Sequence, residues 1–180
     1  MNQLIVGLNS WIIQDGNYDE FRCGDSCRFA LEFGSFSLTY SDKTAMQRQH
    51  KGTSKYDVVA RVIFSTPQVW VIDFGVKVFS ESRPPRFATV GQWVQGEVWI
   101  GVDPYFYKER LHRMPGMPDL FVDWRVARIQ VEITPWIESA LGGRTLRTRD
   151  RTREAWIDRT ATDAWNDDSG GADYLLSLSR

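Results

Sequence analysis

Residues 56–78 of this 180-residue chain read YDVVARVIFSTPQVWVIDFGVKV, and this stretch decides the fold class. Apolar side chains fill every second position from Tyr56 onward and again from Trp70 onward. Such alternation is typical of β-strands that bury one face. Because a short connection, residues 65–68, separates the two runs, we predict that they form a β-hairpin.

Two other apolar patterns change phase partway along their length. The first runs through residues 29–33 and continues in opposite phase through residues 36–40; the second runs through residues 120–126 and then 129–133. One extra residue in a strand, a β-bulge, produces such a switch and bends the strand. Gly34 suits a bulge because glycine tolerates positive φ. Long bulged strands favour a closed or nearly closed barrel, although a sandwich whose strands cross between sheets has the same pattern.

Further segments complete the predicted barrel. Residues 3–13 and 91–103 each have the composition of a strand. Pro104 stands where proline favours the first turn of a helix, and Asp103 before it is a good N-cap residue. We therefore predict a short helix over residues 103–112, inserted before the last strand.

The predicted fold class is all-β: a single bulged β-barrel, OB-like or related. Strand number, bulges and the inserted helix make it similar to OB-type barrels. The resemblance concerns architecture alone, because one barrel type hosts many unrelated functions.

The composition of the sequence changes after Pro135. Arginine is frequent over residues 144–159, and an amphipathic helix is indicated by the spacing of Ile157, Ala161, Ala164 and Trp165. We therefore divide the chain into a β-barrel domain, residues 1–137, and a C-terminal helical appendage, residues 138–180.

Composition limits the classes of partner and the compartment. The formal net charge of −1 gives no overall attraction to nucleic acid or to an anionic membrane. No apolar run approaches the roughly 18 residues of a membrane-spanning helix, so no membrane partner is expected. The N-terminus lacks the pattern of a signal peptide. Two cysteines without an export signal indicate reduced thiols in a cytoplasm.

Candidate catalytic and metal-binding residues do not assemble into a pattern. Zinc sites and Cys-His nucleophiles need convergent ligands, and no such spacing links Cys23, Cys27, His50 and His112. No acid–base pair is singled out among Glu97, Asp103, Asp119 and Asp123. We therefore predict no catalytic residue, no metal and no cofactor, and rank an enzymatic function last.

The outward face of residues 91–103 is the most informative surface. Opposite its Val and Ile side chains lie Trp93, Gln95, Glu97 and Trp99. Either the chain itself covers these tryptophans or they contact a partner, since tryptophan is enriched at interface hot spots. The predicted helix carrying Ile157 and Trp165 is a second candidate surface. The first functional hypothesis is a non-catalytic binding module for another protein, as a hetero- or homo-oligomer.

The alternative hypothesis is a single-stranded nucleic-acid-binding barrel. The segment over residues 105–113 mixes aromatic and basic residues, as base-stacking surfaces do. The candidate residues are Tyr105, Phe106, Tyr107, Arg110 and Arg113.

Overall fold

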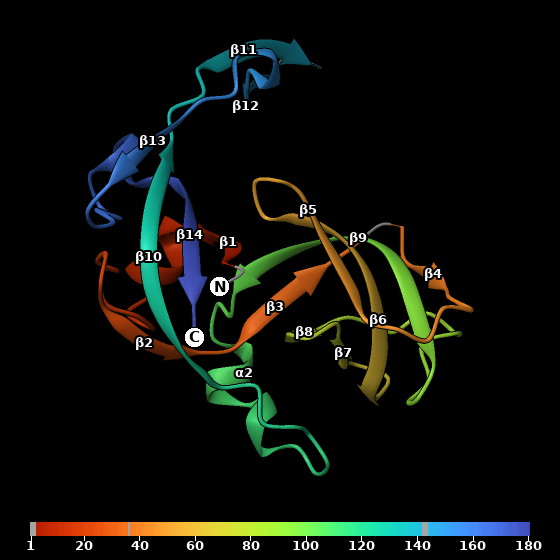
Figure 1. The fold of residues 1–180 in the computed structure, drawn as a ribbon. Helices are drawn as coiled ribbons and strands as arrows, with labels where there is room; N and C mark the ends of the chain where they lie inside the picture. Colours follow the sequence, from red (N-terminus) through yellow and green to blue (C-terminus); the bar gives the residue numbers. More distant parts are fainter. Residues whose placement is uncertain (1–2, 36, 142–143) are drawn as a thin grey trace.

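The computed structural model describes residues 3–35, 37–141 and 144–180. The fold is mostly β and contains a closed barrel, as the sequence predicts. The barrel has five strands, and the strands over residues 4–9 and 122–132, which the sequence places in it, lie outside. A second group of strands lies beside the barrel, and a two-stranded arm projects away from both (Figure 1). Among the described residues, no helix is long and apolar enough to span a membrane.

The barrel closes through one parallel and four antiparallel strand pairs. Its strands are β3 (Leu31–Gly34), β6 (Lys55–Ser65), β7 (Trp70–Asp73), β8 (Lys77–Ser80) and β9 (Trp93–Val102). Strands β6, β7 and β8 form an antiparallel meander, β3 runs parallel to β8, and β9 pairs antiparallel with both β3 and β6. The predicted hairpin is therefore confirmed as β6–β7, with Ser65 opposite Trp70.

The second group of strands includes both ends of the chain. Its members are β1 (Leu4–Asn9), β2 (Ser26–Phe29), β10 (Val122–Glu132), β13 (Trp156–Arg159) and β14 (Asp173–Ser179). Strand β14 lies between β1 and β10, while β2 and β13 pair with β10. A parallel pairing of Gly7 with Gly101 connects β1 to β9 of the barrel.

The remaining elements are short. They are α1 (Ser10–Gln14), β4 (Thr39–Tyr40), β5 (Gln47–Gly52), α2 (Phe106–Glu109), the arm strands β11 (Trp136–Leu141) and β12 (Arg144–Arg149), and the 3-10 turns η1 (Leu111–Arg113), η2 (Arg151–Arg153) and η3 (Asp167–Gly170). Strand β5 extends the barrel sheet beside β6, and β4 pairs with β9.

The alternating residues that predict the strands form the core. Val62, Val94, Val98 and Ile100 have no exposed surface. Burying each such side chain contributes roughly 1.5–3 kcal/mol to folding. A smaller apolar cluster packs under α2 and includes Phe79, Tyr107 and Leu120.

Both predicted bulges are present. Five residue steps from Gly34 to Thr39 face only four from Trp99 to Gln95 on β9, so one extra residue lies between β3 and β4. The second register shift separates Val126 from Arg128 in β10. Leu38 packs against the core after the first bulge, whereas Phe36 lies outside the described residues.

Some predicted local details are wrong. Gly34 is not among the glycines with positive φ, so its role is steric rather than conformational. The first strand ends at Asn9, and α1 begins at the next residue, Ser10. The run from Trp70 divides into β7 and β8 because Asp73 Oδ1 accepts a hydrogen bond from the N–H of Gly75, at 2.9 Å, and closes a turn.

The Asp103 side chain caps the start of α2, but Asp103 is not the N-cap residue that the sequence predicts, because Tyr105 holds that position. Its carboxylate accepts hydrogen bonds from the N–H groups of Tyr105 and Tyr107, both at 3.1 Å, and of Lys108, at 2.8 Å. These bonds satisfy backbone donors that a helix start leaves free. The helix itself is shorter than predicted, because α2 ends at Glu109 and η1 follows.

The predicted C-terminal helix over residues 157–165 is not observed. Ile157 belongs to strand β13 and lies opposite Val131, and Ala164 is buried in a segment between β13 and η3. The helical spacing of these apolar residues is therefore coincidental, since a strand that ends at Arg159 and non-helical chain follow one another here. Strand β14 has both faces covered, as expected of a central strand, because Leu175 and Ser177 are buried as well as Leu176 and Leu178.

Candidate binding cleft

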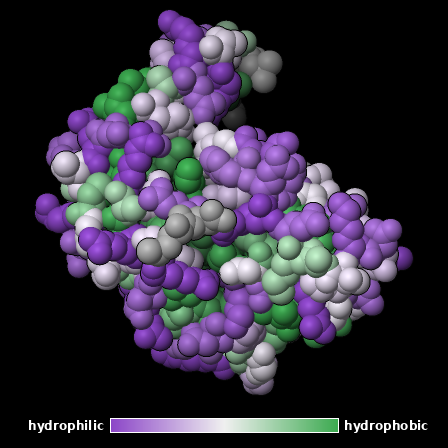
Figure 2. All heavy atoms as spheres, viewed as in Figure 1, coloured by the Kyte–Doolittle hydropathy of each residue, from purple (hydrophilic) through white to green (hydrophobic). Residues whose placement is uncertain are grey.

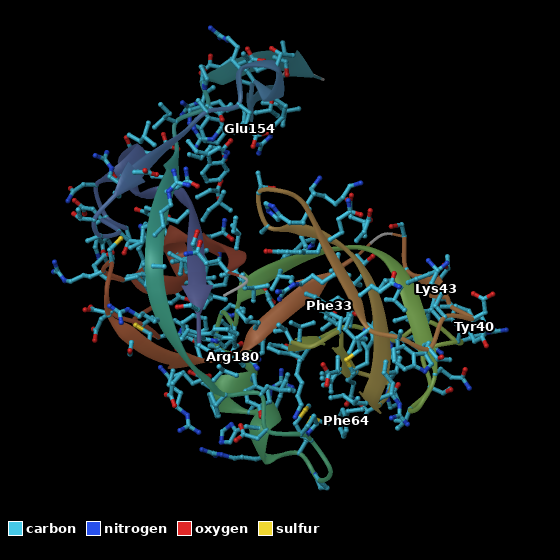
Figure 3. All side chains as sticks on the ribbon, in the orientation of Figure 1. Phe33, Tyr40, Lys43, Phe64, Glu154 and Arg180 are labelled. Atoms are coloured by element: carbon cyan, nitrogen blue, oxygen red, sulfur yellow. The ribbon has the colours of Figure 1, made fainter. Side chains whose placement is uncertain are left out.

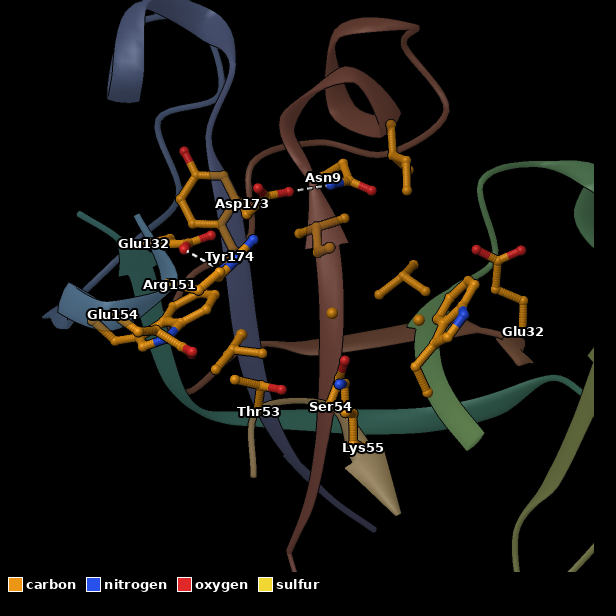
Figure 4. A pocket seen from close by; sticks show the side chains of 18 residues that line it. Asn9, Glu32, Thr53, Ser54, Lys55, Glu132, Arg151, Glu154, Asp173 and Tyr174 are labelled. Atoms are coloured by element: carbon orange, nitrogen blue, oxygen red, sulfur yellow. Dashed lines mark hydrogen bonds and ion pairs between the residues drawn. The ribbon is translucent and has the colours of Figure 1, made fainter. Parts of the chain in front are cut away.

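A cleft of about 500 Å³ opens between the barrel and the second group of strands. Residues that line it come from β1, α1, β3, β6, β9, β10, β13, β14, the β5–β6 turn and the segment around η2. Glu32 lies on one side, Glu132, Arg151 and Glu154 on the other, and Asp173 with Asn9 between them (Figure 4). Its size is within the range of small-ligand sites. Mostly polar residues cover the visible face of the molecule (Figure 2).

Glycines make room for the cleft. Gly7 and Gly101 face each other where β1 meets β9, and both line it. A β-carbon on Gly7 would lie 3.4 Å from Ser54 Oγ, and one on Gly101 would lie 3.0 Å from Trp99 Cζ3. Side chains at these two positions would therefore fill the space that the cleft occupies.

Two tryptophans line the cleft. The indole of Trp99 lies over Gly34 and Gly101, and 38 % of the residue remains exposed. Trp156 comes from β13, and its indole N–H donates to Glu154 Oε1 at 2.8 Å. Exposed indole surface inside a cleft provides apolar area and a ring face that attracts cations.

The cleft has more acidic than basic side chains. Its carboxylates are Glu32, Glu132, Glu154 and Asp173, and its cations are Lys55 and Arg151. With every group ionised, two positive and four negative charges leave a net charge of −2.

Both cations of the cleft already have carboxylate neighbours. Arg151 Nη1 lies 2.6 Å from Glu132 Oε1, and Lys55 Nζ lies 4.0 Å from Glu97 Oε1. Glu32, Glu154 and Asp173 therefore remain as charges not neutralised by an ion pair among the described residues.

Glu32 is the most perturbed of these carboxyls. Burial raises its pKa to about 7, and the nearby charges of Asp103 and Glu81 add to the effect. No hydrogen bond or ion pair to its carboxylate is found in the described part of the chain. Glu32 Oε1 would lie 3.4 Å from a β-carbon on Gly101, the same glycine that Trp99 covers.

Asp173 has a partly compensated setting. Burial raises its pKa, and the charge of Glu132 acts in the same direction, whereas the side-chain amide of Asn9 donates to its carboxylate and lowers it. Arg149 and Arg151 also lower it through their charges. The carboxylate thus lies in the cleft with its orientation fixed by β1.

A buried ionic network supports the acidic side of the cleft. Arg149 Nη2 lies 2.6 Å from Asp168 Oδ2, and its Nη1 donates to the carbonyl of Thr134 at 2.8 Å. Glu132 is only 2 % exposed and is 4.0 Å from Arg149 Nε. These contacts join the base of the arm to β10 and η3. The frequency of arginine over residues 144–159 does not by itself predict this network, because the acidic partners Glu132 and Asp168 lie outside that segment.

The predicted β9 face divides between separate environments. Trp99 lines the cleft, but Gln95 lines a different hollow of about 530 Å³ on the outside of the barrel. Glu97 lies on the surface beside Lys55. Trp93 is half-buried, six positions from Trp99 and therefore roughly 20 Å along the strand. The four residues are consequently not one compact patch.

The second predicted protein-binding pair also lies away from the cleft. Ile157 is 37 % exposed on β13, and Trp165 is 66 % exposed before η3. Neither residue lines the cleft. Tyr40 and Lys43 point outward from the far side of the barrel, and Glu154 lies at the base of the arm (Figure 3).

The candidate nucleic-acid residues do not form an open stacking surface. Tyr107 is 1 % exposed, and its ring packs against Phe79 and Phe121. Arg110 forms an ion pair with Glu81. Tyr105, Phe106 and Arg113 keep part of their surface accessible.

Among the described residues, no group of three His, Cys, Asp or Glu side chains is placed to hold a metal ion. Cys23 and Cys27 are both free thiols.

Sequence reasoning missed Glu32, Trp156 and Asp173, because the chain positions that contribute to the cleft are far apart. Comparison of the chain with known protein families, with curated proteins and with solved structures finds no match.

Proposed function

We propose that the protein is a non-catalytic binding module and that its cleft receives a cationic side chain, lysine or arginine, from a protein partner. The observation that carries this proposal is the exposed indole of Trp99 beside the carboxyl group of Glu32. An aromatic face attracts a cation by about 0.5–2 kcal/mol. A carboxylate at its edge adds a charge-assisted hydrogen bond.

The charge of the cleft supports a cation over an anion. Glu154 and Asp173 add negative charge opposite Glu32, and Arg151 is paired with Glu132. A phosphate or carboxylate ligand would meet three carboxylates not neutralised by an ion pair among the described residues. A single-stranded nucleic acid is disfavoured here for the same reason.

The first experiment uses small probes and the indole N–H signals of the protein in NMR. Nα-acetyl-lysine methylamide and its arginine counterpart should shift the signals of Trp99 and Trp156. The norleucine counterpart, which has a similar length and no charge, should leave them unchanged. Equal shifts with norleucine, or no shift with either cation, would overturn the proposal.

Variants assign the binding to the cleft. Trp99→Ala should weaken binding of the lysine probe at least fivefold, whereas Trp165→Ala, which removes a more exposed tryptophan outside the cleft, should not. A short lysine-containing peptide that binds more tightly than the free amine spermidine supports a protein partner. The opposite ranking would indicate a small organic cation instead.

We also propose that the barrel is of the OB type. Support comes from its five strands, its closure, and neighbours that are not consecutive in the chain, as in a Greek-key barrel. An experimental structure tests this through the strand order and the stagger of the closed barrel. A different order of strands around the barrel would contradict it.

A further inference from the structure

The surroundings of Glu32 make the protonation state of its carboxyl group sensitive to nearby charges. It belongs to β3, lines the cleft beside Trp99, and has neither a hydrogen-bond nor an ion-pair partner among the described residues. Burial penalises a charged carboxylate that has no such partner. Its charge state therefore depends closely on the groups around it.

Two carboxylates near Glu32 raise its pKa, and each of them has compensating partners that Glu32 lacks. Asp103 lies after β9 and Glu81 after β8, and both disfavour ionisation of Glu32. Arg110 compensates Glu81, and Asp103 accepts backbone hydrogen bonds from α2. Glu32 itself receives no such compensation from these groups.

Other titratable or charged groups lie near this end of the cleft. Tyr18 faces Glu32 and Asp103, its hydroxyl has no hydrogen-bond partner in the described part of the chain, and Lys108 lies over its ring at 4.7 Å. Lys55 and Asp173 line the same cleft.

We propose that Glu32 is a pH switch for the cleft: its deprotonated carboxylate completes the cation site beside Trp99, and its protonated form weakens that site. The switch rests on the proposed function. Burial raises the pKa of Glu32 to about 7, so the change falls near neutral pH. A cation that binds the carboxylate also favours its ionised form, and binding then releases a proton.

The test measures the affinity of Nα-acetyl-lysine methylamide from pH 5.5 to pH 8.5 by NMR titration. We expect the wild type to bind about tenfold more tightly at the upper end, because a unit charge near the ligand appears. Glu32→Gln should bind the probe weakly at every pH, and its affinity should change with pH less than a third as steeply as that of the wild type.

His50 provides a matched control, because it lines a hollow that adjoins the cleft at Lys55 and Trp156 but does not line the cleft itself. His50→Gln should keep the pH dependence. If His50→Gln removes it and Glu32→Gln keeps it, the switch is assigned wrongly.

The remaining outcomes separate the two proposals. Binding of equal strength across the pH range would overturn the switch and leave the cation site intact. A folded protein that binds no lysine probe at any pH would overturn the proposed function, and the switch with it.

Discussion

The indole of Trp99 occupies the space that a side chain on Gly34 would need. A β-carbon built on Gly34 would lie 2.6 Å from Trp99 Cζ2, far inside van der Waals contact. Gly34 is paired directly opposite Trp99, and the bulge follows immediately. The glycine therefore fixes the ring against β3 and leaves its outer face toward the cleft.

Gly34→Ala should displace this indole. We expect the free energy of unfolding to fall by about 1–3 kcal/mol, because the added methyl group overpacks a site that is already filled. Chemical denaturation measures the loss, and the NMR signal of the Trp99 indole N–H should shift. Gly171→Ala is the control, since Gly171 has φ −112° and a β-carbon added there would lie 3.6 Å from the nearest atom, the carbonyl oxygen of Asp168. Equal stability of the two variants would contradict this account of Gly34.

Stability should fall as pH rises from about 4.5 to 7. The raised pKa of Glu32 means that the folded state holds a proton that the unfolded state has already released. The stabilisation is therefore complete below the unfolded pKa and is lost as pH passes through the folded value. The full shift, from the ordinary value of 4.5 to about 7, corresponds to roughly 3–4 kcal/mol, at about 1.4 kcal/mol per pKa unit.

Urea denaturation of Glu32→Gln isolates this contribution. The variant cannot titrate at position 32, so its loss of stability between pH 4.5 and 7 should be smaller than that of the wild type. Glu138→Gln removes an exposed carboxylate on the arm and should keep the wild-type slope. Parallel pH profiles for the wild type and Glu32→Gln would show that Glu32 has an ordinary pKa.

Arg149 should contribute strongly to the stability of the fold, although it belongs to an arginine-rich run. Arg149→Met leaves the buried carboxylate of Glu132 with Arg151 alone, whose side chain is 61 % exposed. Removing one partner of a buried ion pair costs about 3–5 kcal/mol. Arg147→Met is the matched control, because Arg147 is 60 % exposed and its ion pair with Glu138 is 3.7 Å long. That change should cost less than about 1 kcal/mol. Similar losses in both variants would exclude the network as the source of stability.

The sequence predicts the barrel well because its evidence is local. Period-two alternation identifies β6, and phase changes identify both bulges before any tertiary contact is known. The helix predicted at residues 157–165 fails because four apolar positions at helical spacing also suit a strand followed by turns. In that segment tertiary partners decide: Ile157 pairs with Val131.

The cleft could not be predicted because it is assembled from distant segments. Only Trp99 among its tryptophans carries a sequence signal, as an aromatic residue on the polar face of a strand. Asp173 enters through β14, which the sequence places in an appendage, and Glu32 reads as an ordinary outward residue of a strand. A raised pKa depends on burial and neighbouring charge, and neither is visible without the fold.

A substitution at Tyr107 distinguishes a structural role of the aromatic segment before η1 from a role in binding nucleic acid. Its hydroxyl donates to the carbonyl of Pro118 and accepts from the N–H of Leu120, both at 2.8 Å. Tyr107→Phe leaves these two groups without their partner, so the free energy of unfolding should fall by about 1–3 kcal/mol. Tyr105→Phe, in a half-buried neighbour, is the control and should change it by less than about 0.5 kcal/mol. A Tyr107→Phe protein of wild-type stability that loses salt-sensitive binding of a single-stranded oligonucleotide would instead favour the nucleic-acid hypothesis. That outcome would require the ring to leave the cluster with Phe79 and Phe121, which the two hydrogen bonds and its burial oppose.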